Sequence, residues 1–359
     1  MSPDAIFHML KKKRMLSLLA ALLLTACSQA DLTESVTSLS DNKQPLRVAI
    51  SPYQDIAMLV SEKKLGLEKK YGTKLEFLTM PWEEIIPAVA SGGNTVDIGF
   101  ASLTEYLCKS ERLNSKGDDP LIYIYPVYVF HGGAFVTFNP KVPALDAEKI
   151  KDPALVRKFL SCKIGAQKNS LWHMLLWLLA SNAGVKFSSI PVIDTTMNDG
   201  LLAAENGSLD VTEAGLTQRT EALKRHGRVV IDMDTANLVD FTGFICKESV
   251  YKQRKKDIES LIKMWFESVN YVLSDLNHHS TDALAYLKTN ASTQYTVEEF
   301  GNALSQEYFP RSIHETQANI VSSKGKYSIE RFSKLCSQYL LDTGAIKSPR
   351  PAPNIITPE

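Results

Sequence analysis

Polar and aromatic residues follow several short apolar runs of this 359-residue chain, at the points where the runs end. If these runs are strands of parallel sheets, the residues lie at the carboxyl ends of the strands, where helix N-termini converge and ligands bind. This rule selects ten candidate ligand-binding residues: Tyr53, Gln54, Asp55, Trp82, Ser102, Thr104, Asn169, Ser170, Trp172 and Glu213. Their carboxylates, hydroxyls, amides and aromatic rings are suited to holding a small molecule.

Each candidate also has a purely structural interpretation. Ser102 and Ser170 can be helix N-caps and nothing more, and the aromatic candidates can belong to the core. Trp82 is the preferred candidate for a wall that stacks on the ligand. We expect Glu213 to contact the same ligand as Trp82 from the opposite side of a cleft.

The residues near these positions give conflicting indications about the ligand. Hydroxyls at helix N-termini are suited to a small anion such as a sulfonate. Asp55, Glu83 and Glu213, however, lie at or near the same strand ends, and Lys168 is the one cation near them. Carboxylates beside tyrosine and tryptophan are suited to an amine-bearing or heteroaromatic ligand, through charge-assisted hydrogen bonds and cation–π contacts. We prefer the second class and keep the anion as the alternative.

The composition and the missing motifs exclude several other functions. The chain has 40 basic and 40 acidic residues, whereas nucleic-acid binders normally carry a basic excess. It contains no G-x-G-x-x-G, Walker A, H-E-x-x-H or G-x-S-x-G motif, so we predict no catalytic residue, cofactor or metal site. Four cysteines beyond the N-terminal region permit two disulfides in three pairings, although buried thiols are the default interpretation: Cys108, Cys162, Cys246 and Cys336.

The N-terminal segment predicts export and lipidation. Four basic residues at 11–14 precede an apolar run at 15–24 that is too short to span a bilayer. The sequence L-T-A-C that ends at Cys27 resembles a bacterial lipobox, in which the cysteine is acylated, for example with palmitate, and becomes the first residue of the mature protein. We therefore expect a signal peptide at 1–26 and a lipidated tether at 27–45; the alternative is a plain signal peptide cleaved beside Cys27.

Alternating strands and helices must position the candidate residues. Strands and helices are predicted in turn at 46–51, 56–64, 74–78, 82–90, 96–101 and 103–108, and again at 163–166, 170–181, 190–194, 201–205, 209–214 and 216–226. The stretches "VASGGNTVDIGFAS" and "AAENGSLDVTEAGL" both leave a helix at glycine and enter a strand as apolar-Asp-apolar, which supports two lobes of like design. Beyond them, helices are predicted at 258–272, 282–289, 297–304 and 328–341.

Four stretches carry a resemblance to a known family: "LRVAISPYQDIAMLVSEKKLGLEKKYGTKLEFLTMPW", "AVASGGNTVDIGFAS", "CKIGAQKNSLWHMLLWLLASNAGV" and "LLAAENGSLDVTEAGLTQR". In this order they resemble the periplasmic solute-binding proteins of nitrate, sulfonate and taurine ABC importers, a family that includes binding proteins for thiamine-precursor pyrimidines. The match in pattern covers 46–276. The segment 145–163 is longer than the usual connection in the family.

The resemblance implies a two-lobe α/β periplasmic-binding-protein fold (type II), with mainly parallel sheets covered by helices on both faces and the ligand in a cleft between the lobes. It implies crossover strands near 127–134 and 234–242. The domain limits that follow are 46–127 and 243–342 for lobe 1, 128–242 for lobe 2, and 343–359 for a proline-rich tail.

The function implied is that of a monomeric substrate-binding lipoprotein, tethered in the periplasm or at the cell surface, that delivers a small molecule to a permease and ATPase complex. The alternatives are a ligand sensor without a transporter and an enzyme of the same fold in pyrimidine synthesis.

Overall fold

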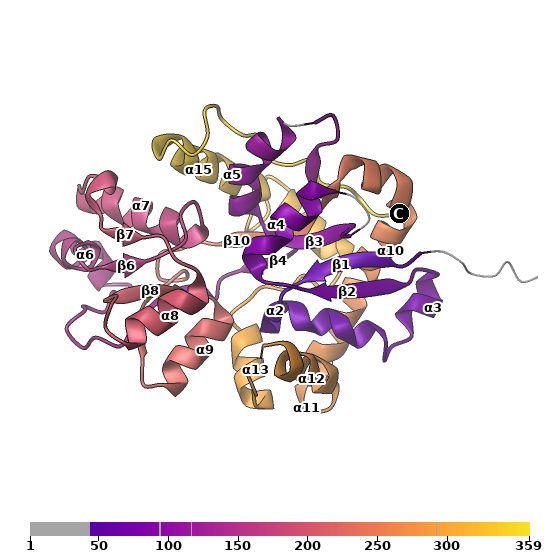
Figure 1. Cartoon of the computed structure of the whole chain (residues 1–359), viewed down its shortest axis with the longest axis horizontal. Coiled ribbons are helices and arrows are strands. Elements are labelled where there is room, and N and C mark those ends of the chain that lie inside the picture. Colours follow the sequence, from indigo (N-terminus) through magenta and orange to yellow (C-terminus); the bar gives the residue numbers. More distant parts are fainter. Residues whose placement is uncertain (1–43, 93–94, 116, 292) are drawn as a thin grey trace, which may run out of the picture. The chain divides into compact units, whose positions relative to one another are not determined.

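The computed structural model describes residues 44–92, 95–115, 117–291 and 293–359. The predicted signal peptide and Cys27 lie outside the described residues, as does the tether up to residue 43. The described part contains two five-stranded sheets covered by helices (Figure 1). None of its helices is both long and apolar enough to cross a bilayer.

The first sheet has the strand order β2-β1-β3-β10-β4. Its strands are β1 (Leu46–Ile50), β2 (Leu75–Thr79), β3 (Ile98–Ser102), β4 (Leu121–Phe130) and β10 (Asp240–Lys247). Strand β1 pairs in parallel with β2 and β3, whereas β10 is antiparallel to both β3 and β4.

The second sheet repeats this arrangement in the order β7-β6-β8-β5-β9. Its strands are β5 (Ala134–Thr137), β6 (Ile164–Gly165), β7 (Val192–Ile193), β8 (Val211–Ala214) and β9 (Arg228–Asp232). Strand β6 pairs in parallel with β7 and β8, and β5 is antiparallel to β8 and β9.

Each sheet is therefore mixed, with a parallel core of three strands. The chain passes from one sheet to the other through 131–133 and returns through 233–239. Because β5 and β10 are the strands that follow these passages, they enter each sheet in the opposite direction to its parallel core. Of the long apolar strand β4, only the end was expected, as part of a crossover strand near 127–134. Its start was missed, since its mostly buried run lacks the alternation that marks a half-buried strand.

The helices of the βα units follow their strands closely. Around the first sheet they are α2 (Gln54–Ala57), the 3-10 helix η1 (Met58–Glu62), α3 (Leu67–Tyr71), α4 (Trp82–Ser91) and α5 (Leu103–Asn114). Around the second they are η2 (Lys149–Lys151), α6 (Pro153–Leu160), α7 (Leu171–Ala183), η3 (Phe187–Ser189), α8 (Met197–Glu205) and α9 (Leu216–Lys224). Two differ from expectation: the helix predicted at 56–64 is the short α2 followed by η1, and the long segment 145–163 contains α6.

The C-terminal part is helical, as predicted. Its helices are α10 (Glu248–Ser274), α11 (Leu276–His279), α12 (Thr281–Asn290), α13 (Val297–Leu304), α14 (Ile313–Thr316), the π-helical turn η4 (Gln317–Val321) and α15 (Ile329–Asp342). Helix α15 packs against α5 and also against α7, so it joins the helical layers of both sheets (Figure 1). No regular secondary structure follows beyond residue 345.

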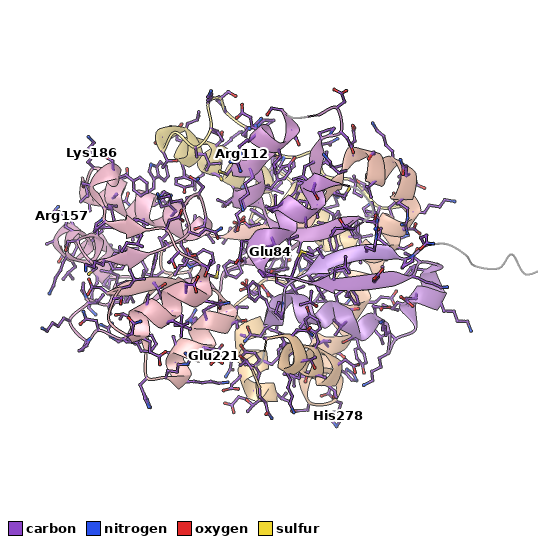
Figure 2. All side chains as sticks on the ribbon, in the orientation of Figure 1. Glu84, Arg112, Arg157, Lys186, Glu221 and His278 are labelled. Atoms are coloured by element: carbon purple, nitrogen blue, oxygen red, sulfur yellow. The ribbon has the colours of Figure 1, made fainter. Side chains whose placement is uncertain are left out.

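The core of the first sheet lies under α10. The predicted apolar face of that helix is fully buried, and Trp265 at its centre packs edge-on against Phe100 of β3. The Trp265 indole N–H donates to the carbonyl of Val127 in β4 at 3.2 Å. Charged side chains such as Arg157 and Lys186 point outward (Figure 2). The four cysteines of the described part are free thiols.

Candidate functional site

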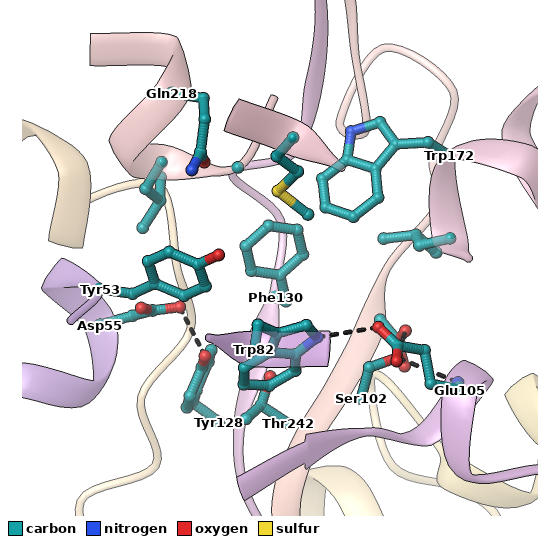
Figure 3. Close-up of a pocket in the computed structure, with 15 residues that line it drawn as sticks. Tyr53, Asp55, Trp82, Ser102, Glu105, Tyr128, Phe130, Trp172, Gln218 and Thr242 are labelled. Atoms are coloured by element: carbon teal, nitrogen blue, oxygen red, sulfur yellow. Dashed lines mark hydrogen bonds between the residues drawn. The ribbon is translucent and has the colours of Figure 1, made fainter. Parts of the chain in front are cut away.

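A cavity lies where the carboxyl ends of the parallel strands in the two sheets meet (Figure 3). It has an empty volume of about 560 Å³, part of which is open to solvent. Its lining is Tyr53, Asp55, Trp82, Ser102, Glu105, Tyr128, Phe130, Leu171, Trp172, Met197, Gly215, Leu216, Gln218, Asp240 and Thr242. A concave, largely apolar site with a few convergent polar groups at this edge of the sheets is where α/β proteins bind small molecules.

Tyr53 and Trp82 separate this inner cavity from the outside. Both residues also line two outer hollows, one toward α12 and the other toward the first turn of α8. Their rings are tilted against each other with 6.1 Å between centroids. The pair is therefore the part of the lining that a solute meets first.

The tryptophans of the cavity are fixed by hydrogen bonds. The Trp82 indole N–H donates to Glu105 Oε1 at 2.8 Å, and that of Trp172 donates to the Ala134 carbonyl at 3.0 Å. Trp172 also meets the Phe130 ring edge-on, with 5.9 Å between centroids. Because both indole donors are already used, these residues offer a ligand only their apolar surfaces.

Asp55 presents an unused acceptor to the cavity. It lies in the first turn of α2, 4% exposed, and the Tyr128 hydroxyl donates to its Oδ2 at 2.5 Å. Its Oδ1 has no hydrogen-bond partner among the described residues. Burial raises the pKa of Asp55 to about 6, although the Tyr128 hydroxyl and nearby backbone N–H groups of α2 oppose that rise. The carboxylate is therefore costly when ionised, and a donor or cation would relieve that cost.

The other two carboxylates of the lining are fully engaged. Glu105 accepts from Trp82 through Oε1 and pairs with Lys109 Nζ through Oε2 at 2.6 Å. Asp240 accepts from the Ser102 hydroxyl at 2.5 Å through Oδ2, and its Oδ1 accepts from backbone N–H groups. Burial raises the pKa of Asp240 to about 6, against the effect of its hydrogen bonds. These two groups serve to fix the walls of the cavity.

The charge of the cavity has one sign. Among the described residues that line it there is no lysine or arginine. Lys109 lies outside the lining and forms an ion pair with Glu105. An anion would meet buried carboxylates here and no cation, which is unfavourable at low dielectric.

Five of the ten predicted residues line the cavity: Tyr53, Asp55, Trp82, Ser102 and Trp172. Two others sit directly beside them. Gln54 accepts a hydrogen bond from the Thr217 hydroxyl at 2.7 Å, and the N–H of Thr104 donates to Asp240 at 3.3 Å. Ser102 also caps α5, accepting from the N–H of Glu105, so both of its interpretations hold in the structure.

The remaining three predicted residues lie behind the wall on the second-sheet side. Ser170 caps α7, accepting from the N–H of His173 at 3.3 Å, and its hydroxyl lies 3.4 Å from Glu213 Oε2. Asn169 precedes it with a left-handed backbone (φ 63°). Glu213 is fully buried outside the lining, and burial raises its pKa to about 8. A ligand contact by Glu213 stays a prediction.

Five lining residues with polar groups were missed by sequence reasoning: Glu105, Tyr128, Gln218, Asp240 and Thr242. Glu105 and Gln218 lie in the first turns of α5 and α9, so extending the strand-end rule by one helical turn finds them. Tyr128 and Asp240 lie on β4 and β10. Because β10 is antiparallel to β3, its first residues fall beside the carboxyl end of β3, where a rule built on parallel strands does not look.

Several solved binding proteins are similar to this chain. The periplasmic aliphatic sulphonate-binding protein of Escherichia coli superposes with a TM-score of 0.60 and 16% identity, over 85% of this chain and 94% of that protein. The alkanesulfonate-binding protein of Xanthomonas axonopodis pv. citri, solved with bound MOPS, superposes with a TM-score of 0.63 and 13% identity, over 86% of this chain and 96% of that protein. The periplasmic nitrate-binding protein of Synechocystis PCC 6803 superposes with a TM-score of 0.60 and 12% identity, over 86% of this chain and 83% of that protein.

The chain has the periplasmic-binding-protein fold. The predicted fold class is thereby confirmed, and so is the structural resemblance to sulfonate- and nitrate-binding proteins. No protein-family model matches the sequence, and neither does any curated protein.

Proposed function

We propose that this protein is the solute-binding component of an ABC importer and captures a small organic molecule in the inner cavity. The observation that carries the proposal is the unpaired, buried Oδ1 of Asp55 in an aromatic-walled cavity at the strand ends. The periplasmic-binding-protein fold and the similar solved structures, which are sulfonate- and nitrate-binding proteins, support a binding role rather than a catalytic one.

The proposed ligand is an amine-bearing or heteroaromatic molecule. A buried carboxylate favours a partner that donates hydrogen bonds or carries positive charge. The faces of Tyr53, Trp82 and Phe130 favour a flat body and add cation–π attraction. The alkanesulfonate-binding neighbour was solved with a sulfonate, and the acidic lining is the feature of this chain that argues against the same ligand class.

The proposed cellular setting is a monomer held at the membrane by a lipid on Cys27, facing the periplasm or the cell surface. It would hand its solute to a permease with an attached ATPase. The lobe limits proposed for the moving parts are those predicted from the sequence, 46–127 with 243–342 and 128–242. The passages between the sheets, at 131–133 and 233–239, lie a few residues inside the second range, and we propose that the lobes turn about them.

A thermal-shift screen of the purified protein tests the proposed function. Aromatic and heteroaromatic amines should raise the melting temperature, because a ligand that binds only the folded state stabilises it. Sulfonates and nitrate, matched in size, should not. Stabilisation by sulfonates alone would overturn the ligand class, and X-ray scattering that shows no compaction at saturation would contradict the closing motion.

The lipid anchor has a separate test. Cys27→Ala should release the protein from the membrane fraction and abolish labelling by a fatty-acid analogue. Cys108→Ala, which alters a thiol in the folded part, is the matched control and should leave both unchanged. Equal membrane association of Cys27→Ala and the unaltered chain would exclude the anchor.

A further inference from the structure

The first turns of α2 and α9 touch at one end of the cavity. The Thr217 hydroxyl of α9 donates to Gln54 Oε1 of α2 at 2.7 Å, a bond that joins the first-sheet side to the second-sheet side. The next residue of each helix, Asp55 and Gln218, lines the cavity (Figure 3). This contact brings a carboxylate and an amide to one end of the site from opposite sides.

Both side chains bury an acceptor atom that receives no hydrogen bond of good geometry from the described residues, although Tyr53 lies beside the Gln218 amide and backbone N–H groups of α2 lie beside the Asp55 carboxyl. Asp55 is 4% exposed and Gln218 is 2% exposed. Asp55 Oδ1 and Gln218 Oε1 have no hydrogen-bond partner among the described residues, whereas Gln218 Nε2 donates to Asn198 Oδ1 at 2.9 Å. An unsatisfied buried acceptor destabilises the protein that holds it, so two such atoms facing one cavity indicate a missing donor.

At the other end of the cavity, the carboxylate oxygens already have hydrogen-bond donors. Figure 3 shows Glu105 and Ser102 on the far side of Trp82 from Asp55. All carboxylate oxygens of Glu105 and Asp240 already accept hydrogen bonds. The site therefore has one end that requires donors, an aromatic middle, and a second end that is complete without a ligand.

We infer that the solute is a flat aromatic or heteroaromatic amine with a single donor group, and that its N–H bonds are shared between Asp55 Oδ1 and Gln218 Oε1. The inference rests on the proposed function and names the part of the solute that the site recognises. Because the two acceptors come from opposite sides, the same nitrogen that is recognised also holds the two sides together.

Three kinds of related molecule are excluded by this arrangement. A quaternary ammonium has the charge but no N–H bond for either acceptor. An aromatic sulfonate places a negative charge beside Asp55. An aliphatic diamine lacks the flat body, and its second amine finds no free acceptor at the Glu105 end.

The test is calorimetric titration of the full protein with tryptamine and phenethylamine, their N-trimethylated derivatives, phenylethanesulfonate and putrescine. Asp55→Asn should weaken binding of the two amines about ten- to a hundredfold, since it removes a charge-assisted bond. Gln218→Met should weaken it about three- to tenfold. Glu62→Gln is the matched control, a buried carboxyl with two unpaired oxygens on η1 away from the cavity, and should bind like the unaltered chain.

The outcomes separate the inference from the proposed function. Binding of the amines, weaker or absent binding of the other four compounds, and loss in Asp55→Asn support the inference. Equal binding of the trimethylated compounds overturns the N–H requirement but leaves an amine-binding protein. Binding of the sulfonate that survives Asp55→Asn, or no binding of either amine at millimolar concentration, overturns the inference. The proposed function fails only if the wider thermal-shift screen also finds no solute.

Discussion

The two sheets share a strand order but present different chemistry to the cavity. Strands at the same position in the two orders correspond: β2 to β7, β1 to β6, β3 to β8, β10 to β5 and β4 to β9. All three carboxylates of the lining come from the first-sheet side: Asp55, Glu105 and Asp240. The second-sheet side supplies Leu171, Trp172, Met197, Gly215, Leu216 and Gln218. Repetition of one design thus yields a charged half and a mostly apolar half, which together fit a flat molecule with one polar end.

One structural feature is kept in both copies of the repeat, while the strand residues that follow it diverge. In the two echoing stretches, Asp97 and Asp210 occupy the same place, and each accepts a backbone N–H at the start of the neighbouring strand. The donors are Arg47, the second residue of β1, and Lys163, the residue before β6, both at 2.9 Å. Three residues later the stretches differ, because Phe100 packs in an aromatic core and Glu213 is a buried acid. The comparison shows that the aspartates have the same structural role in both sheets, whereas the strand residues three positions later do not.

The largest expected effect concerns Glu213. Its folded pKa of about 8 lies above the ordinary value of 4.5, so the folded chain holds a proton that the unfolded chain releases. The free energy of unfolding should therefore fall by about 1.4 kcal/mol per pH unit from this group as pH rises between these two values. Glu213→Gln should remove that contribution, which denaturant unfolding of both proteins across the pH range measures.

Other buried acids also titrate in this range, so the difference between the two proteins is the quantity to compare. Glu62→Gln provides a second reference, since burial raises the pKa of Glu62 to about 7. Parallel stability curves for Glu213→Gln and the unaltered chain would show that Glu213 has the same pKa in the folded and the unfolded chain, and would contradict the effect of burial on this group.

Removal of Trp82 should have the next largest effect. Trp82→Ala should weaken binding of an aromatic amine by about 1–3 kcal/mol, or roughly ten- to a hundredfold, because it deletes the wall between the cavity and the outside. Trp177→Ala on α7, half-buried against Tyr339 and outside the lining, is the control. Equal affinity in the two variants would place the solute elsewhere.

Substitution of the two equivalent aspartates, Asp97 and Asp210, should have the smallest effect and tests the repeat most directly. Asp97 is nearly buried and also pairs with the Arg47 guanidinium, which holds the pKa of that carboxyl below its ordinary value although burial opposes this. Asp97→Asn should therefore cost about 1–3 kcal/mol of stability and Asp210→Asn about 0.5–1.5 kcal/mol, measured by urea unfolding. A larger loss of stability in Asp210→Asn than in Asp97→Asn would contradict the prediction that the aspartate of the first sheet contributes more.

The sequence was sufficient for the fold and for five of the fifteen residues that line the cavity, for identifiable reasons. Apolar runs with glycine turns located the parallel strands, and the residues just after them include Asp55 and Trp82. Tyr128 lies near the carboxyl end of β4, which runs in the same direction as the parallel core, whereas Asp240 opens β10, which enters the same edge from the antiparallel direction. No local pattern reveals the pairing of β4 with β10. Asp55 and Glu213 look alike in the sequence and are both buried, but only Asp55 lines the cavity, and the sequence does not show that difference.

The central claim is that ionised Asp55 holds an amine, and the pH dependence of binding tests it most directly. Phenethylamine affinity, titrated from about pH 8 to about pH 5, should fall roughly tenfold per pH unit below the Asp55 pKa of about 6, because a protonated carboxyl must lose its proton before it can pair with the cation. Tyr53, Tyr128 and Glu307 are titratable groups near it, and burial raises the pKa of each. Asp55→Asn keeps all three and therefore controls for their titration. The fall should be absent in Asp55→Asn. An affinity that does not change with pH, or one that falls equally in Asp55→Asn, would contradict the account.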